Sequence, residues 1–168
     1  MRMNTFTKVL IAASLLISFV KPANAQTVAG ARAQNIFVEL GGPGLLLSAN
    51  YDTRFTNRHD GVGGRIGAGY VSISDNSLLT IPVQINYLLG KNNRYFELGI
   101  GATFINSKGD ERDFLSLDDA KGTIGTMTFG YRYQPEDGGF HFKASLNPIF
   151  NSSTFFPFFG GVGVGYTF

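Results

Sequence analysis

The 168-residue sequence contains no cysteine and no tryptophan, and only 15% of its residues are charged. Without cysteine the chain has no disulfide framework, no thiolate metal site, no catalytic thiol and no lipid-modified cysteine. The low charge excludes a disordered chain and a coiled coil, because both carry many charged residues. No apolar run reaches the roughly 20 residues that a membrane-spanning helix requires.

Glycine and aromatic residues are abundant instead. There are 22 glycines, nearly twice the ordinary share, and 14% of the residues are aromatic. The length suits a single domain and is too short for two. Many glycines and aromatics with few charges are unusual in a water-soluble domain but typical of a short membrane β-barrel.

The beginning of the chain has the composition of a secretory signal peptide. Arg2 and Lys8 make the start positive, and residues 9–20 form an apolar segment of twelve residues. Twelve residues are too few to cross ~30 Å of hydrocarbon, which argues against a membrane anchor. The small residues Ala23 and Ala25 have the spacing of a cleavage site, so we expect the mature chain to begin at the next residue.

Cleavage there divides the chain into a signal peptide at 1–25 and one β-barrel domain at 26–168, exported by a Sec-type route. The signal segment carries three of the 14 basic residues and none of the 12 acidic ones. Residues 26–168 therefore hold 11 basic and 12 acidic residues, a net charge of −1. No basic cluster remains, so we expect no binding of nucleic acid.

From residue 34 onward, apolar and polar residues alternate with a period of two, which is typical of strands with two different faces. The second segment, for example, places Leu45, Leu47 and Tyr51 on its apolar face. No convincing helical pattern lies between the segments. Eight strands are predicted, at 36–40, 45–55, 62–72, 80–89, 95–104, 123–133, 140–148 and 156–168.

The composition of the two faces distinguishes a membrane barrel from a soluble one. The apolar face is bulky and continuous in all eight segments, whereas the other face carries few charges and many Gly, Ser, Thr and Asn residues. A soluble barrel would instead need a charged exterior. The sequence therefore predicts an all-β fold, an eight-stranded antiparallel up-and-down transmembrane β-barrel with a narrow polar lumen. A soluble ligand-binding β-barrel is the alternative.

The connections between the segments agree with this topology. Short turns at 56–61, 90–94 and 134–139 would lie at the periplasmic end. The other connections, 41–44, 73–79, 105–122 and 149–155, would lie at the outer end. An aromatic belt is expected near the periplasmic rim, formed by Tyr51, Phe55, Tyr87, Phe96, Tyr131, Tyr133, Phe140, Phe142, Tyr166 and Phe168.

The last residues continue the alternation with Val164, Tyr166 and Phe168. With the signal peptide and the eight segments, this pattern resembles the small Gram-negative outer-membrane barrels typified by OmpX and the membrane domain of OmpA. In such proteins the barrel-assembly machinery recognises the aromatic C-terminus, so the resemblance implies that role for Tyr166 and Phe168. It also implies a monomer in contact with outer-membrane lipids and lipopolysaccharide. Gly161 departs from the pattern, because the assembly signal often has a polar residue there.

Several charged residues lie at the alternate strand positions that form the polar, inward face. The lumen of a barrel of eight strands is narrow. Because an unpaired buried charge is costly, we expect the acids to pair with the bases as a structural plug. A lumen that conducts protons or ions is the alternative. The candidate network consists of Glu39, Asp52, Arg54, Arg65, Glu97, Arg132, His141 and Lys143.

The sequence offers no convincing catalytic set. His141 and Ser145 lie four residues apart on the inward face, whereas lipid A deacylase barrels carry a His and a Ser two apart on the lipid face. The acids within 105–122 do not match a calcium-binding loop, and the Gly-x-Gly pairs do not complete a dinucleotide motif. We therefore expect no catalytic residue, no metal and no cofactor.

These observations favour a non-catalytic scaffold. Its outer connections 73–79, 105–122 and 149–155 would be displayed for surface interaction, adhesion or envelope integrity. A lipid-modifying outer-membrane enzyme similar to the lipid A deacylases is the alternative of a different class.

Overall fold

A computed structural model describes residues 32–73, 76–108 and 122–168. The predicted signal peptide, with Ala23 and Ala25, and most of the 105–122 connection lie outside the described residues. Within the described ranges, no helix is long and apolar enough to cross a membrane.

The described part consists of strands and one turn of 3-10 helix, η1 (Gly42–Gly44). The strands are β1 (Gln34–Gly41), β2 (Leu47–Arg54), β3 (Gly61–Ile73), β4 (Asn76–Lys91), β5 (Arg94–Lys108), β6 (Gly122–Tyr133), β7 (Gly139–Leu146), β8 (Ile149–Phe150), β9 (Phe155–Phe156) and β10 (Gly160–Thr167).

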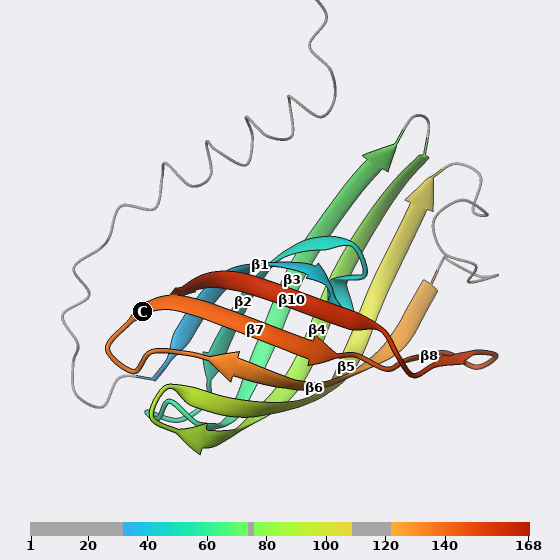
Figure 1. Cartoon of the computed structure of the whole chain (residues 1–168). Helices are drawn as coiled ribbons and strands as arrows, with labels where there is room; N and C mark the ends of the chain where they lie inside the picture. Colours follow the sequence, from blue (N-terminus) through green and yellow to red (C-terminus); the bar gives the residue numbers. More distant parts are fainter. Residues whose placement is uncertain (1–31, 74–75, 109–121) are drawn as a thin grey trace, which may run out of the picture.

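The strands form one closed antiparallel sheet (Figure 1). Neighbours pair in the order β1-β2-β3-β4-β5-β6-β7-β10, and β10 pairs with β1 to complete the circle. The predicted eight-stranded antiparallel barrel is therefore confirmed. Closure leaves no unpaired strand edge along the wall, as a bilayer requires of a spanning sheet.

Two prolines explain why there are more strand segments than strands in the barrel wall. Pro148 separates β7 from β8, and Pro157 separates β9 from β10. Proline has no backbone N–H and cannot donate a hydrogen bond to a ladder. β6 nevertheless pairs with β7 and then with β8 in one continuous register, so β8 is a continuation of β7.

The two ends of the barrel differ, and we name them the turn end and the loop end. At the turn end, short connections join β2 to β3, β4 to β5 and β6 to β7. Asn92 and Asn93 both have positive φ, 57° and 68°, as a two-residue hairpin turn with this twist requires. The register places Tyr166 beside Phe140 and Phe96 beside Tyr131 near this end, where the aromatic belt is predicted.

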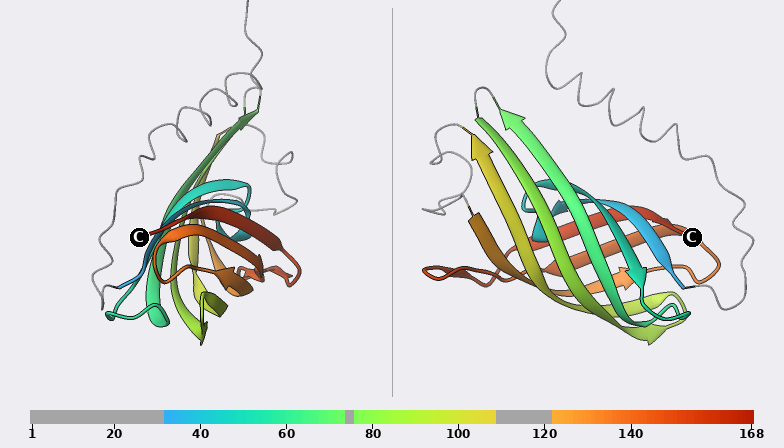
Figure 2. Two further views of the ribbon diagram at one scale, coloured as in Figure 1. Left: turned by 60° about the vertical axis from the view of Figure 1, so that its left-hand side comes forward. Right: turned by 180° about the vertical axis from the view of Figure 1, so that it is seen from behind.

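The wall of the barrel is higher on one side than on the other (Figure 2). β3 to β6 have 12 to 16 residues each, whereas β1, β2, β7 and β10 have eight. The predicted loop at 73–79 is therefore largely wrong, because β4 begins at Asn76 and pairs there with Ile73. The ladder bonds join backbone groups, so the strands continue after the apolar alternation has stopped.

A second correction concerns Leu45, which the alternation placed on the lipid face. β2 begins only at Leu47, and Leu45 is 1% exposed with a φ of 70°. Gly41 and Gly42 also have positive φ, so the chain turns inward and the two-residue period does not extend through this segment. Leu45 packs inside the loop end with Leu78, Ile105, Ile124 and Ile149.

Along the wall itself, the faces are distributed as predicted. The residues that point outward are bulky and apolar, and Ile100 in the middle of β5 is 56% exposed. The residues between them are polar and buried, among them Glu97 and Arg132. A charged interior beneath an apolar surface is the arrangement of a transmembrane β-barrel and the reverse of a soluble one.

We expect Ile100→Arg to lower the free energy of unfolding in a bilayer by about 2–4 kcal/mol, because it places a charge at the middle of the lipid-facing wall. Urea unfolding of the protein reconstituted in vesicles measures the change. The control is Ser153→Arg, at an exposed hairpin tip, which should alter stability little. If both variants are equally stable, the outer face is in contact with water and the membrane interpretation is wrong.

Candidate functional site in the lumen

The centre of the lumen is an arginine that bridges two carboxylates. Arg132 Nη1 lies 2.8 Å from Asp52 Oδ1, and Arg132 Nη2 lies 2.9 Å from Glu97 Oε2. All three side chains are buried. β2, which carries Asp52, and β6, which carries Arg132, are four places apart in the closed order of eight. The ion pair between them therefore joins opposite sides of the barrel.

The other charges extend this bridge in both directions. Arg54 Nη2 lies 2.6 Å from Asp52 Oδ1. Lys143 Nζ lies 3.2 Å from Glu97 Oε2 and 3.4 Å from Glu39 Oε1. Glu39 also pairs with Arg65. The seven charged residues thus form one continuous chain of ion pairs: Arg54, Asp52, Arg132, Glu97, Lys143, Glu39 and Arg65.

Side-chain amides satisfy further hydrogen-bonding groups of this chain. Asn86 accepts a hydrogen bond from Arg54 Nη2 at 2.6 Å and donates one to Asp52 Oδ2 at 2.5 Å. Asn50 accepts from Arg65 Nε at 3.0 Å. The network predicted from the sequence consisted of charged residues and His141, so it did not include these amides. Their inward parity was the signal that could have identified them.

His141 stands apart from the ion pairs. It is buried, but among the described residues neither of its ring nitrogens has a hydrogen-bond partner. Its ring meets the edge of Phe37 at 5.1 Å between centroids. The same Phe37 ring lies 5.0 Å from Arg65 Cζ and 5.4 Å from Lys143 Nζ, so its π face contacts two cations of the network. Phe37 was not part of the network predicted from the sequence, although it lies at an inward position of β1.

The loop end of the lumen is closed by the β1–β2 connection. Thr103 Oγ1 donates to the carbonyl of Pro43 at 2.6 Å, and Thr80 Oγ1 donates to that of Gly44 at 2.9 Å. Gly42 lies against Glu39, where a Cβ atom would come within 2.6 Å of the carboxylate. The apolar cluster around Leu45 packs in this end of the barrel. The connection therefore closes the barrel instead of projecting from it.

Amides close the turn end. Asn35 Nδ2 donates to Gln134 Oε1 at 2.9 Å, and Gln134 Nε2 donates to the carbonyl of His59 at 3.0 Å. Both amide side chains are buried. Polar contacts thus span the barrel below the charged centre as well.

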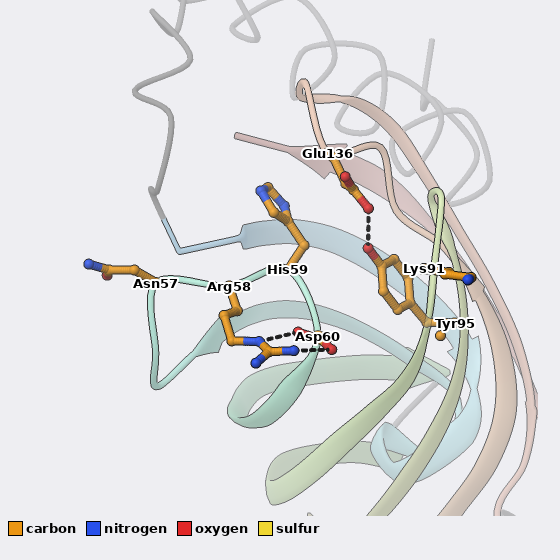
Figure 3. Close-up of a pocket in the computed structure, with 8 residues that line it drawn as sticks. Asn57, Arg58, His59, Asp60, Lys91, Tyr95 and Glu136 are labelled. Carbon is orange, nitrogen blue, oxygen red and sulfur yellow. Dashed lines mark hydrogen bonds and ion pairs between the residues drawn. The ribbon is translucent and has the colours of Figure 1, made fainter.

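Outside this closure lies a pocket of about 380 Å³, whose lining includes Arg58, Asp60, Lys91, Tyr95 and Glu136 (Figure 3). Arg58 Nε donates to Asp60 Oδ1 at 2.7 Å, and this bond lowers the pKa of Asp60. Tyr95 donates to Glu136 at 2.9 Å. Lys91 points away from these pairs. Four of the polar side chains of the pocket are therefore paired with one another, whereas His59 Nδ1 has no hydrogen-bond partner among the described residues.

Ser145 and His141 do not form a nucleophile and base pair. They are four residues apart on β7, a separation of ~13 Å along an extended strand. The Ser145 hydroxyl donates to Asn147 Oδ1 at 3.3 Å. In the described part of the chain, no group of three or more His, Asp or Glu residues is placed to hold a metal ion.

No protein-family model and no curated protein matches this sequence. Among solved structures, the chain is similar to the N-terminal β-barrel domain of Pseudomonas aeruginosa OprF, with a TM-score of 0.56 and 16% identity over 83% of this chain and 98% of that one. It is also similar to the Yersinia pestis outer membrane protein Ail, with a TM-score of 0.50 and 15% identity over 82% and 99% of the two chains. The shared feature is the fold, an eight-stranded barrel of the outer-membrane type.

We expect Glu97→Ala to lower the free energy of unfolding by about 3–5 kcal/mol, because it leaves Arg132 and Lys143 short of a buried carboxylate. The double variant Glu97→Ala/Lys143→Met should regain part of the lost free energy of unfolding, since one of the two cations is then removed. Urea unfolding of the reconstituted protein measures both variants.

The matched control is Asp60→Ala, which breaks the ion pair with the exposed Arg58 side chain and should cost less than about 1 kcal/mol. A Glu97→Ala protein as stable as the control would contradict the packed plug and favour a hydrated lumen.

Proposed function

We propose that the protein is an integral outer-membrane β-barrel with a packed, non-conducting lumen, and that it acts without catalysis by presenting its loop end at the cell surface. The observation that carries the proposal is the chain of ion pairs through the middle of the barrel, in which Arg132 connects opposite walls. The fold shared with OprF and Ail supports the membrane location.

The composition of the high wall supports display at the loop end. The last outward apolar residues on β3, β4 and β5 are Tyr70, Leu79 and Phe104. Beyond them the outward positions become polar, as at Ser77 and Asn106. The wall therefore continues past the apolar band, and the connections that it carries are held above the bilayer. Surface interaction, adhesion or envelope integrity are the roles that fit such a scaffold.

The outer face would contact outer-membrane lipids and lipopolysaccharide, and the closed sheet needs no second copy for completion. A lipid-modifying enzyme is the alternative. It would need a nucleophile beside a base on the lipid-facing side. His141 is buried in the lumen and separated from Ser145 along β7, which favours the non-catalytic role.

Display at the cell surface can be tested with inserted epitope tags. We expect a tag after residue 114, in the long connection that follows β5, to bind antibody on intact cells. A tag in the turn after residue 136, between β6 and β7, should bind only after the outer membrane is permeabilised. The reverse result, or equal labelling of both tags, would contradict the proposed orientation.

Two measurements on the untagged protein accompany this test. Mass spectra of lipid A should be identical in cells with and without the protein, and the purified barrel in a planar bilayer should show no steady conductance. Loss of an acyl chain would establish the enzyme alternative. A steady conductance would contradict the packed lumen.

We further propose that the barrel-assembly machinery recognises Tyr166 and Phe168. Both side chains are partly exposed on the outer face at the turn end. The backbone of Phe168 also exchanges two hydrogen bonds with Gln34, of 3.0 and 3.2 Å, which close the barrel. Deletion of Phe168 would remove recognition and closure together, whereas a substitution keeps the backbone bonds.

We expect Phe168→Ser to reduce the amount of barrel in the outer membrane severalfold, while the purified protein keeps nearly the wild-type stability in detergent. Fractionation and heat-dependent gel migration measure the two effects. Phe168→Leu is the control, because it keeps an apolar side chain without the aromatic ring. Wild-type levels of both variants in the outer membrane would leave Phe168 as an ordinary residue of the aromatic belt.

A further inference from the structure

The hairpin formed by β8 and β9 exposes phenylalanine outside the barrel wall. Phe155 is 64% exposed, and Phe158, which follows β9, is 79% exposed. At the tip of the hairpin, Asn151 Oδ1 accepts hydrogen bonds from the backbone N–H groups of Ser153 and Thr154 at 2.9 and 2.6 Å. Large apolar side chains that point outward from a hydrogen-bonded hairpin mark a contact surface.

The register shows on which side of the wall the Phe155 ring lies. Phe150 of β8 pairs with Gly125 of β6 on one side and with Phe155 of β9 on the other. Residues that pair directly across a ladder share a face. Gly125 has the same outward parity as Phe129, which is exposed on the lipid-facing wall. Phe155 therefore continues the lipid-facing surface of β6.

Gly125 is where the hairpin docks on the wall. The ring of Phe150 occupies the position of a side chain there, and a Cβ atom on Gly125 would lie 2.2 Å from it. Pro148 and Pro157 interrupt the two strands at the base of the hairpin. Despite the interruption, Figure 1 shows β8 continuing the course of β7 beyond the wall.

The height of the apolar surface explains why this side of the barrel needs the hairpin. On β4, alternate outward residues from Leu79 to Leu89 are apolar and cover ~33 Å of strand. At the usual tilt this corresponds to ~25 Å of height, which matches the apolar band of outer-membrane barrels. On β7, the outward residues from Phe140 to Leu146 cover ~20 Å of strand and ~15 Å of height. The low wall is therefore ~10 Å too short for the same band.

We propose that the β8–β9 hairpin is a lipid anchor whose Phe155 and Phe158 side chains insert among the acyl chains of the outer leaflet, and not a surface loop that waits for a soluble ligand. The inference rests on the proposed membrane location. The apolar side of the hairpin is continuous with the lipid-facing wall, and its polar tip, Asn151 to Thr154, would reach the headgroups. Tyr70 and Phe104 are the aromatic residues at the top of the apolar band on the high wall.

The absence of tryptophan from the chain gives a direct test. Four single-tryptophan variants are made in the full-length protein: Phe155→Trp and Phe158→Trp in the hairpin, Phe129→Trp in the middle of the wall, and Ser153→Trp at the hairpin tip. Each is purified from membranes and reconstituted in phosphatidylcholine vesicles that carry bromine at a shallow or a deep position of the acyl chain. Heat-dependent gel migration confirms that each variant is folded.

We expect both hairpin tryptophans to emit at shorter wavelength than the Ser153→Trp variant and to lose most of their fluorescence to the shallow bromines. Phe129→Trp should be quenched most strongly by the deep bromines. Ser153→Trp should be quenched by neither. In a bilayer of shorter lipids, quenching of the hairpin tryptophans should decrease, because the hydrocarbon no longer reaches them, whereas Phe129→Trp should remain quenched.

Two results would overturn the anchor and leave the membrane barrel intact. In the first, Phe129→Trp is quenched but the hairpin tryptophans behave like Ser153→Trp, so the hairpin lies in water. In the second, they emit at short wavelength without quenching by bromine, so a second copy of the chain covers them. If Phe129→Trp is itself unquenched, the proposed membrane location fails.

Discussion

The pairing of charges inside the lumen is the constraint on which the rest of the barrel depends. An isolated charge in a narrow lumen would cost several kcal/mol, and the described residues place seven buried charges there. Each of them is in an ion pair, and Arg132 binds both Asp52 on the opposite wall and Glu97 on the neighbouring strand. Such pairs add little net stability, but they make other strand registers costly, because those registers would separate the paired charges. A slip of one residue in any of these strands would move its charges into the lipid.

The high glycine content follows from the same constraint. Seven long charged side chains need room inside eight strands, and the inward glycines supply it. A Cβ atom on Gly63 would lie 2.2 Å from Arg54 Cζ, and one on Gly163 would lie 3.0 Å from Lys143 Cγ. The composition that first suggested a membrane barrel is therefore explained by its interior as well as by its surface.

The unequal wall heights connect the fold with the bilayer. On the high side, β3 to β6 carry the backbone ladder beyond the apolar band. On the low side, the strands stop early, and prolines separate them from the β8–β9 hairpin. The sheet thus spans the same hydrocarbon thickness with long strands on the high side and with short strands extended by the β8–β9 hairpin on the low side.

The two-residue alternation was sufficient to predict the class of fold and the number of barrel strands, and the seven charged residues that it placed on the inward face are buried inside the barrel. This was possible because parity along a strand depends on local sequence alone. The pattern was misleading where the backbone left the strand, as at Leu45, and where a ladder continued through polar residues, as at the start of β4.

Only the tertiary structure decided which charges meet. Asp52 and Arg132 are 80 residues apart in the sequence, and parity alone would allow several other partners for each. The tilt and stagger of the closed sheet set the height of every residue along the barrel axis, and those heights select the pairs. The same geometry left His141 against Phe37 and outside the ion-pair network. The sequence thus determined what faces the lumen, and closure of the barrel determined what touches within it.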